Sequence, residues 1–105
     1  EGETIRAQVE SLLIPVLHNG DFGMEVMAKK LGFSRQMLYR KLKAEGVSFE
    51  KILDELRFKM ALHYLSGKKA SATETGYLVG FSDPSSFSRA FKRWTGSSPG
   101  RQNPV

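Results

Sequence analysis

The stretch that decides the fold is residues 76–96, which read GYLVGFSDPSSFSRAFKRWTG. Its pattern predicts a short helix, a turn at Gly80 and a second helix. Asp83 can accept a hydrogen bond from the free N–H groups at the start of that second helix, and Pro84 suits its first position. One apolar face is predicted by residues that recur at three- and four-residue spacing, namely Phe87, Ala90, Phe91 and Trp94.

The opposite face of this second helix carries hydroxyl groups and cations but no carboxylate. Its residues are Ser85, Ser88, Arg89, Lys92 and Arg93. Such a face suits the phosphates and base edges of a nucleic acid. For one such helix taken alone, an ordinary solvated face stays open as an alternative.

An earlier stretch, residues 28–43, repeats this pattern with one residue fewer after the turn. The Gly-Phe-Ser run at 80–82 has its counterpart at 32–34, and Arg40 and Lys43 correspond to Arg89 and Lys92. Each copy is a short helix, a tight glycine turn and a cationic second helix, which is the helix-turn-helix plan. In that plan the outward face of the second helix enters the major groove of DNA.

The rest of the chain also reads as helical. Further helices are predicted over Glu3–His18 with a kink or shortening at Pro15, Met24–Leu31, Ser34–Glu45 stopped by Gly46, and Ser48–Ser66, and a capping box at Ser71–Glu74 begins the helix before Gly80. Asn19-Gly20-Asp21 and Lys68-Lys69-Ala70 read as turn and loop, and the tail 97–105 as at most one helical turn. No segment alternates apolar and polar residues, so the predicted class is all-α.

Length and composition point to a small basic domain. The 105 residues form one domain or two very small ones sharing a connector, and the absence of cysteine excludes disulfides and thiolate metal sites. No apolar run approaches the roughly 18–20 residues of a membrane span. The sequence starts at Glu1 without methionine, so we expect a piece of a longer protein.

The positive charge is concentrated on the two predicted second helices. The formal net charge is +5, of which +3 falls on residues 34–45 and +2 on residues 83–95. Residues 3–18 carry a net charge of −1. This distribution favours a polyanionic partner more strongly than the total charge does.

These residues resemble the DNA-binding domain of the AraC/XylS family of bacterial transcription regulators. The resemblance runs from about Glu3 to Pro99, and its most specific part is Gly80-Phe81-Ser82-Asp83 with residues 87–93, Gly96 and Pro99. It implies a seven-helix domain with two helix-turn-helix motifs joined by a long linker helix, divided as 1–46, 47–67 and 68–105. The linker, at about 28 Å, compares with a DNA turn of roughly 34 Å, so two helices at that separation could enter successive major-groove segments.

The resemblance also implies a function and a site. Such a domain binds double-stranded promoter DNA without a cofactor or metal, in the bacterial cytoplasm on the nucleoid. It follows a domain that senses an effector or dimerises, and most members activate transcription by contacting RNA polymerase. Base contacts are expected from Gln36, Tyr39, Arg40, Ser85, Ser88 and Arg89, and phosphate contacts from Ser34, Arg35, Lys43, Ser82, Lys92 and Arg93. By chemistry, Arg40 and Arg89 suit guanine and Gln36 suits adenine.

Departures from the family pattern concern Gly76, where alanine is usual, the tail and Pro84. Glycine costs about 1 kcal/mol relative to alanine in a helix, so it should loosen the short helix. Residues 99–103 lack the family's common tyrosine–arginine pair. Pro84 stands where members often have a polar residue.

Alternative interpretations remain open. Arg40 and Arg89 could pair with Asp54 or Glu55 of the linker helix, and Tyr39 could cover apolar surface. An enzyme is disfavoured because neither histidine, His18 or His63, has a triad or metal-ligand set near it in sequence. The rival functions are a helical protein-interaction module for an acidic partner and a DNA-binding fragment of a sigma-factor-like protein or a recombinase.

Overall fold

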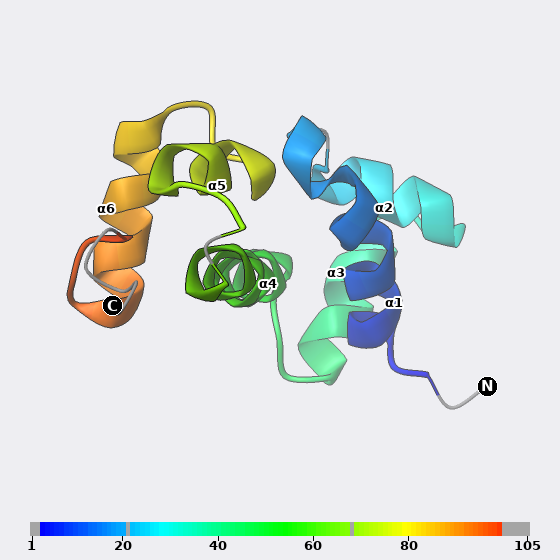
Figure 1. Cartoon of the computed structure of the whole chain (residues 1–105). Helices are drawn as coiled ribbons and strands as arrows, with labels where there is room; N and C mark the ends of the chain where they lie inside the picture. The colour runs from blue at the N-terminus through cyan, green and yellow to red at the C-terminus, as the bar shows by residue number, and fades with distance from the viewer. Residues whose placement is uncertain (1–2, 21, 68, 100–105) are drawn as a thin grey trace. The chain divides into compact units, whose positions relative to one another are not determined.

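The computed structural model describes residues 3–20, 22–67 and 69–99, and over these ranges the chain is helical, without a strand (Figure 1). It contains α1 (Ile5–Leu13), the 3₁₀ helix η1 (Ile14–Asn19), α2 (Met24–Leu31), α3 (Arg35–Ala44), α4 (Phe49–Ser66), α5 (Ala72–Leu78) and α6 (Pro84–Thr95). The predicted all-α class is confirmed. No helix in the described ranges is long and apolar enough to cross a membrane.

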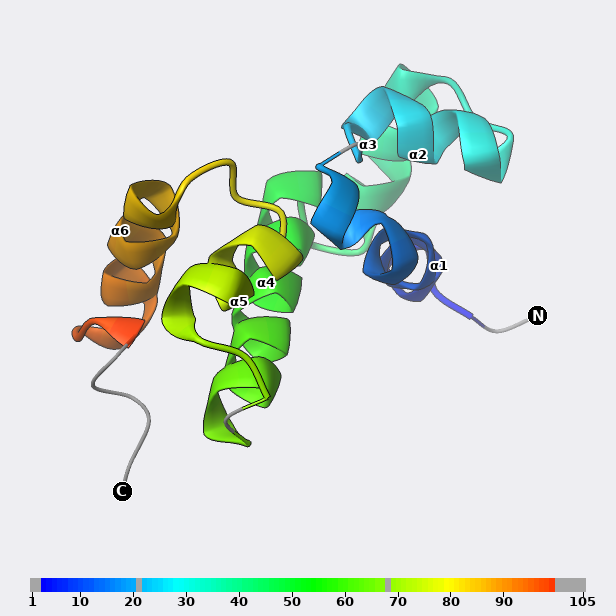
Figure 2. The same cartoon turned by 45° about the horizontal axis from the view of Figure 1, so that its top comes forward.

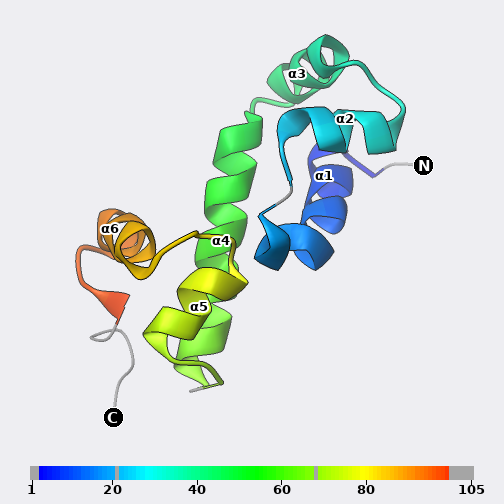
Figure 3. The ribbon, with the colours of Figure 1, turned by 90° about the horizontal axis from the view of Figure 1, so that it is seen from above.

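The chain packs as two units, each with one helix-turn-helix. The described part of the first covers 3–17 and 22–56, and that of the second covers 18–20, 57–67 and 69–99. The division falls after Leu56, inside α4, which runs through it as one continuous helix (Figure 3).

Hydroxyl and carboxylate caps start the helices at the residues that the sequence predicts. The hydroxyls of Ser34 and Ser48 accept hydrogen bonds from backbone N–H groups three residues later, at 3.0 and 3.1 Å. Ser71 and Glu74 form the predicted capping box, each side chain bonding to the other's backbone N–H. Asp83 caps α6 by accepting from the Ser86 N–H at 2.8 Å. Each cap satisfies a donor that the helix leaves free.

The two glycine turns have the same hydrogen bonds, which confirms the repeat at the level of the backbone. After α2 the Phe33 N–H donates to the Ala28 carbonyl at 2.8 Å, and after α5 the Phe81 N–H donates to the Gly76 carbonyl at 2.9 Å. The glycine between, at 32 or 80, has a φ of 80° or 99°. This is the Schellman motif, in which a left-handed residue turns the chain out of a helix.

The number of helices differs from the seven that the resemblance implies. Pro15 has no N–H to donate, and α1 ends at Leu13 with the chain continuing as η1. Beyond α6, Gly96 adopts a φ of 88°, and no further α-helix begins before residue 100. The expectation of seven α-helices is therefore wrong for the described residues, which have six. Asp21, Lys68 and residues 100–103, which carried turn, loop and tail predictions, lie outside the described residues.

In the first unit, α1, α2 and α3 pack around an apolar core joined by the first turns of α4. Its buried side chains are Val9, Leu13, Leu17, Phe22, Met27, Ala28, Leu38, Leu42, Phe49, Ile52 and Leu56. Glu45 binds the start of α1 here, because its carboxylate accepts from the N–H groups of Ile5 and Arg6 at 2.8 and 2.9 Å.

In the second unit, α5 and α6 pack closely because Gly76 has no side chain. Figure 2 shows the turn that joins these two helices. A Cβ built on Gly76 would lie 2.9 Å from the Cβ of Phe87, an atom fixed to the α6 backbone. Phe87 and Phe91 are buried, and their rings meet those of Phe58, Phe81 and Trp94 at centroid distances of 5.6–6.2 Å. The glycine at this position thus has a packing role that its helix propensity does not reveal.

We predict that Gly76→Ala destabilises the protein by about 1–3 kcal/mol although alanine is the better helix former, because the added methyl overpacks against Phe87. Urea unfolding measures the change. Thr73→Ala on the exposed side of α5 is the matched control and should change stability by less than about 0.5 kcal/mol. A Gly76→Ala protein as stable as the parent would mean that α5 and α6 separate without cost.

We also predict a pH-dependent contribution from Asp83. Hydrogen bonds from the backbone N–H and hydroxyl of Ser86 lower the pKa of Asp83 below its usual 3.8. Since the pKa is lowered in the folded state, the ionised carboxylate stabilises the fold above pH 3.8 and ceases to do so as pH falls through the lowered pKa. Asp83→Asn keeps a capping oxygen without the charge. The melting temperature of Asp83→Asn should lie below that of the parent at about pH 5, and this difference should shrink as the pH is lowered to about 2.5. A difference that stays constant would contradict the assignment.

Candidate nucleic-acid interface

The first candidate surface is the outward face of α3. Leu38 and Leu42 are buried at 0% and 1% exposure and fix the rotation of the helix about its axis. At about 100° per residue, Gln36 and Arg40 then lie on the opposite side, one turn apart. Both are exposed. The surface therefore joins an amide and a guanidinium on one ridge.

Arg40 pairs with no carboxylate among the residues that the structure describes. Glu55, one of the partners considered from the sequence, is instead hydrogen-bonded to Arg6 and lies 3.8 Å from Lys51. Glu55 and Glu10 raise the pKa of Arg6, with the Glu10 hydrogen bond as the largest cause. The ion-pair alternative for Arg40 is thus contradicted, and its guanidinium keeps its donors for an external acceptor.

Tyr39 lies on the flank of α3. Its side chain is 54% exposed, and the Lys43 ammonium lies 5.9 Å from its ring centroid. Together with Leu42 and Phe49 it lines a hollow of about 270 Å³ between α3 and the start of α4. Tyr39 therefore borders apolar surface, as the structural alternative expects, while more than half of it stays open to solvent.

The second candidate surface is the outward face of α6, opposite the buried Phe87, Ala90 and Phe91. Arg89 is less available here than Arg40 is on α3. Its guanidinium donates to the Ser86 hydroxyl at 3.4 Å, and that hydroxyl donates to Asp83 at 3.0 Å. Its hydrogen-bond partner within the second unit is therefore the start of its own helix.

The structure gathers the predicted contact residues into two sets, and every member is exposed. The first set lies on or before α3 and comprises Ser34, Arg35, Gln36, Tyr39, Arg40 and Lys43; the second lies on or before α6 and comprises Ser82, Ser85, Ser88, Arg89, Lys92 and Arg93. One member of the first set already has a structural task, since the Ser34 oxygen caps α3. Its hydroxyl proton can still be donated.

The sequence did not predict a role for two residues beside these surfaces, Arg57 and Met37. Arg57 of α4 stacks on the Phe81 ring at 4.3 Å and donates to the Gly80 carbonyl at 3.3 Å, which ties α4 to the turn before α6. No local pattern links positions 23 residues apart. Met37 on α3 is 43% exposed. Its spacing of three from Arg40 could have placed it on the outward face.

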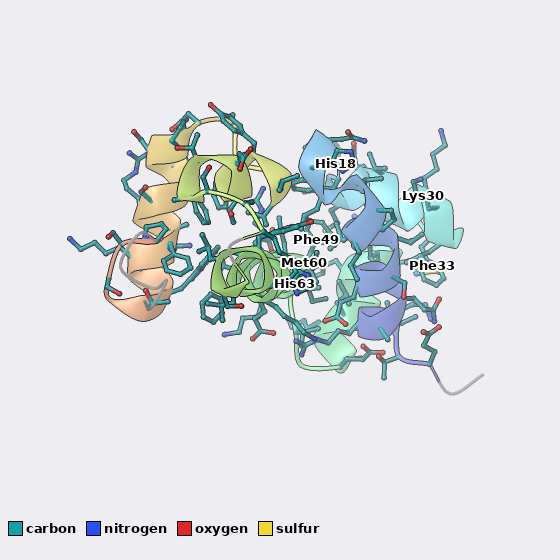
Figure 4. The ribbon with its side chains drawn as sticks, in the orientation of Figure 1. His18, Lys30, Phe33, Phe49, Met60 and His63 are labelled. Carbon is teal, nitrogen blue, oxygen red and sulfur yellow. The ribbon has the colours of Figure 1, made fainter. Side chains whose placement is uncertain are left out.

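The described ranges offer no cluster of three or more His, Cys, Asp or Glu that could hold a metal ion. His18 lies in η1 and His63 in α4, and both are exposed (Figure 4). What the surfaces offer is hydrogen-bond donors and positive charge on two helices, each braced by a shorter helix across a glycine turn. That chemistry recognises phosphates and base edges.

Comparison with known proteins agrees with this arrangement. A family described as a helix-turn-helix domain matches residues 27–102. The ornithine utilization regulator of Pseudomonas aeruginosa is 37% identical over 98 residues, covering 92% of this chain and 28% of that protein. The HTH-type transcriptional activator RhaS of Escherichia coli is 37% identical over 76 residues, covering 71% and 27%.

Among solved structures, the DNA-binding domain of the global transcriptional factor AdpA in complex with a target DNA is similar, with a TM-score of 0.80. It is 26% identical, and the match covers 94% of this chain and 89% of that domain. The chain spans less than a third of the two curated relatives. With this fold, these two surfaces and these relatives, the chain belongs to the AraC/XylS family of helix-turn-helix transcription regulators.

Proposed function

We propose that the chain binds specific duplex DNA sequences by placing α3 and α6 in successive segments of the major groove. The observation that carries this proposal is the pair of matched helices, each with one face buried in its own unit and the other exposing amide, hydroxyl and cationic groups. The 18 residues of α4, which belongs to both units, give it a length of about 27 Å, and one DNA turn is roughly 34 Å.

The roles of the side chains follow from their chemistry. Arg40 can bridge O6 and N7 of guanine, and Gln36 can pair with adenine. To contact a guanine, Arg89 would give up its hydrogen bond to the Ser86 hydroxyl and donate to the base instead. The small Ser85 and Ser88 make fewer base contacts, so α6 relies more on phosphates and DNA shape. Tyr39, on the flank of α3, is available to contact a base. The remaining members of the two sets would contact phosphates; they are Ser34, Arg35, Lys43, Ser82, Lys92 and Arg93.

The whole protein would be a transcription regulator acting on the bacterial nucleoid. The relatives are more than three times longer than the part that matches. We therefore propose a further domain that senses an effector or dimerises, and activation through contact with RNA polymerase at promoter DNA. The name of RhaS as a transcriptional activator supports activation over repression.

Selection of bound sequences from random duplexes, followed by gel shifts at two salt concentrations, tests the proposal. The enriched sequences should contain two motifs about one helical turn apart, bound at least about 10³-fold more tightly than bulk competitor DNA. Affinity should fall steeply as salt rises. Equal binding to every duplex would contradict the proposal and leave a module for an acidic protein as the better account.

Substitution of the two arginines tests the base assignments. Arg40→Ala and Arg89→Ala should each weaken the selected sequence by about 1–3 kcal/mol and relax preference in one motif only. The matched control is Lys30→Ala on α2, which also removes one positive charge but lies on neither candidate surface (Figure 4). The melting temperature should not change, because both arginines are exposed. Equal weakening on all sequences would make these residues phosphate contacts.

A further inference from the structure

Met37 is an apolar side chain on a surface that is otherwise polar. It is 43% exposed, whereas Met27 is fully buried and Met24 and Met60 are half-buried. A thioether side chain left in water forgoes the free energy that burying its apolar area would supply. Its position on the face of α3 that carries Gln36 and Arg40 calls for a partner with an apolar group.

The backbone holds Met37 in a fixed position. It lies in the first turn of α3, where its N–H donates to the Ser34 hydroxyl at 3.0 Å. The next residue, Leu38, is fully buried and anchors the helix from the inner side. The first turn is also the part of a recognition helix that reaches the base edges. The backbone at Met37 is therefore fixed, and its side chain projects from the end of α3 that would reach the bases.

The major groove of DNA offers one apolar group, the C5-methyl of thymine. We propose that Met37 contacts a thymine methyl and thereby specifies a T·A pair in the half-site bound by α3. The assignment rests on the proposed function and deepens it. Met37 and Arg40 are three residues apart, which places their Cβ atoms about 5–6 Å from each other. At 3.4 Å per base pair, the thymine then lies within about two base pairs of the base that Arg40 reads.

Other exposed apolar residues share the exposure but not the position. Ile14 lies in η1, and Tyr77 and Leu78 lie on α5, so none of them belongs to α3 or α6. Tyr39 lies on the flank of α3, but it carries a hydroxyl and its ring faces the Lys43 ammonium. Exposure alone therefore does not carry the inference. The combination of exposure, a fixed place in the first turn and polar neighbours suited to bases distinguishes Met37, and Leu78→Ala supplies a control that removes exposed apolar surface elsewhere.

The test uses the selected duplex and replaces each thymine in turn with deoxyuridine, which lacks only the methyl. One replacement in the α3 half-site should weaken binding of the parent protein about four-fold, the effect of one buried methyl. Met37→Ala and Met37→Gln should bind the thymine duplex about as weakly as the parent binds the deoxyuridine duplex, with no further loss on replacement. Met37→Leu should keep most of the sensitivity, and Leu78→Ala all of it.

The outcomes separate this inference from the function on which it rests. If the selected duplex is bound specifically but no deoxyuridine replacement in the α3 half-site matters, or Met37→Ala keeps the full sensitivity, the thymine contact is wrong. A selection that enriches no thymine near the Arg40 position also overturns it. Failure to prefer any sequence would instead refute the proposed function itself. Melting temperatures of the Met37 variants should equal that of the parent, since the side chain is exposed.

Discussion

Two matched backbone hydrogen bonds fix the geometry on which both candidate surfaces depend. Phe33 donates to the Ala28 carbonyl and Phe81 to the Gly76 carbonyl, each across a glycine with a positive φ. Each bond ends the bracing helix and turns the chain toward the next helix start. The acceptor residues, Ala28 and Gly76, are small and buried. The same position therefore accepts the hydrogen bond of the turn and lets the second helix pack closely.

Once each recognition helix is packed in this way, its solvent face follows. Leu38 and Leu42 on α3, and Phe87 and Phe91 on α6, leave one direction for the remaining side chains. The positive charges then project outward because they have no buried alternative, and burying an unpaired charge would be costly. Specificity in the proposed DNA complex thus depends on the packing of buried side chains that do not face the DNA.

Much of this fold is predictable from the sequence because its signals are local. The caps at Ser34 and Asp83 act over three residues, and all twelve predicted contact residues are exposed as expected. The contacts that were not predicted join residues that are far apart in the sequence. Glu45, predicted only as the end of a helix, binds backbone N–H groups of α1 some 40 residues earlier, and the contact that explains Gly76 involves Phe87 on another helix. Neither contact produces a periodic pattern in the sequence from which it could be predicted.

In the proposed DNA complex, the more recognisable second motif makes the fewer base contacts. The second motif is identified chiefly by its phenylalanines, its glycine and its Asp-Pro helix start, all of which serve packing and capping. Its Arg89 donates to Ser86 beside that cap, while Arg40 of the first motif has no such contact with any residue in the described ranges. Packing constrains residue types strongly and so makes a motif visible. Base reading uses the positions that packing leaves free, and those positions can vary with the DNA sequence that each regulator recognises.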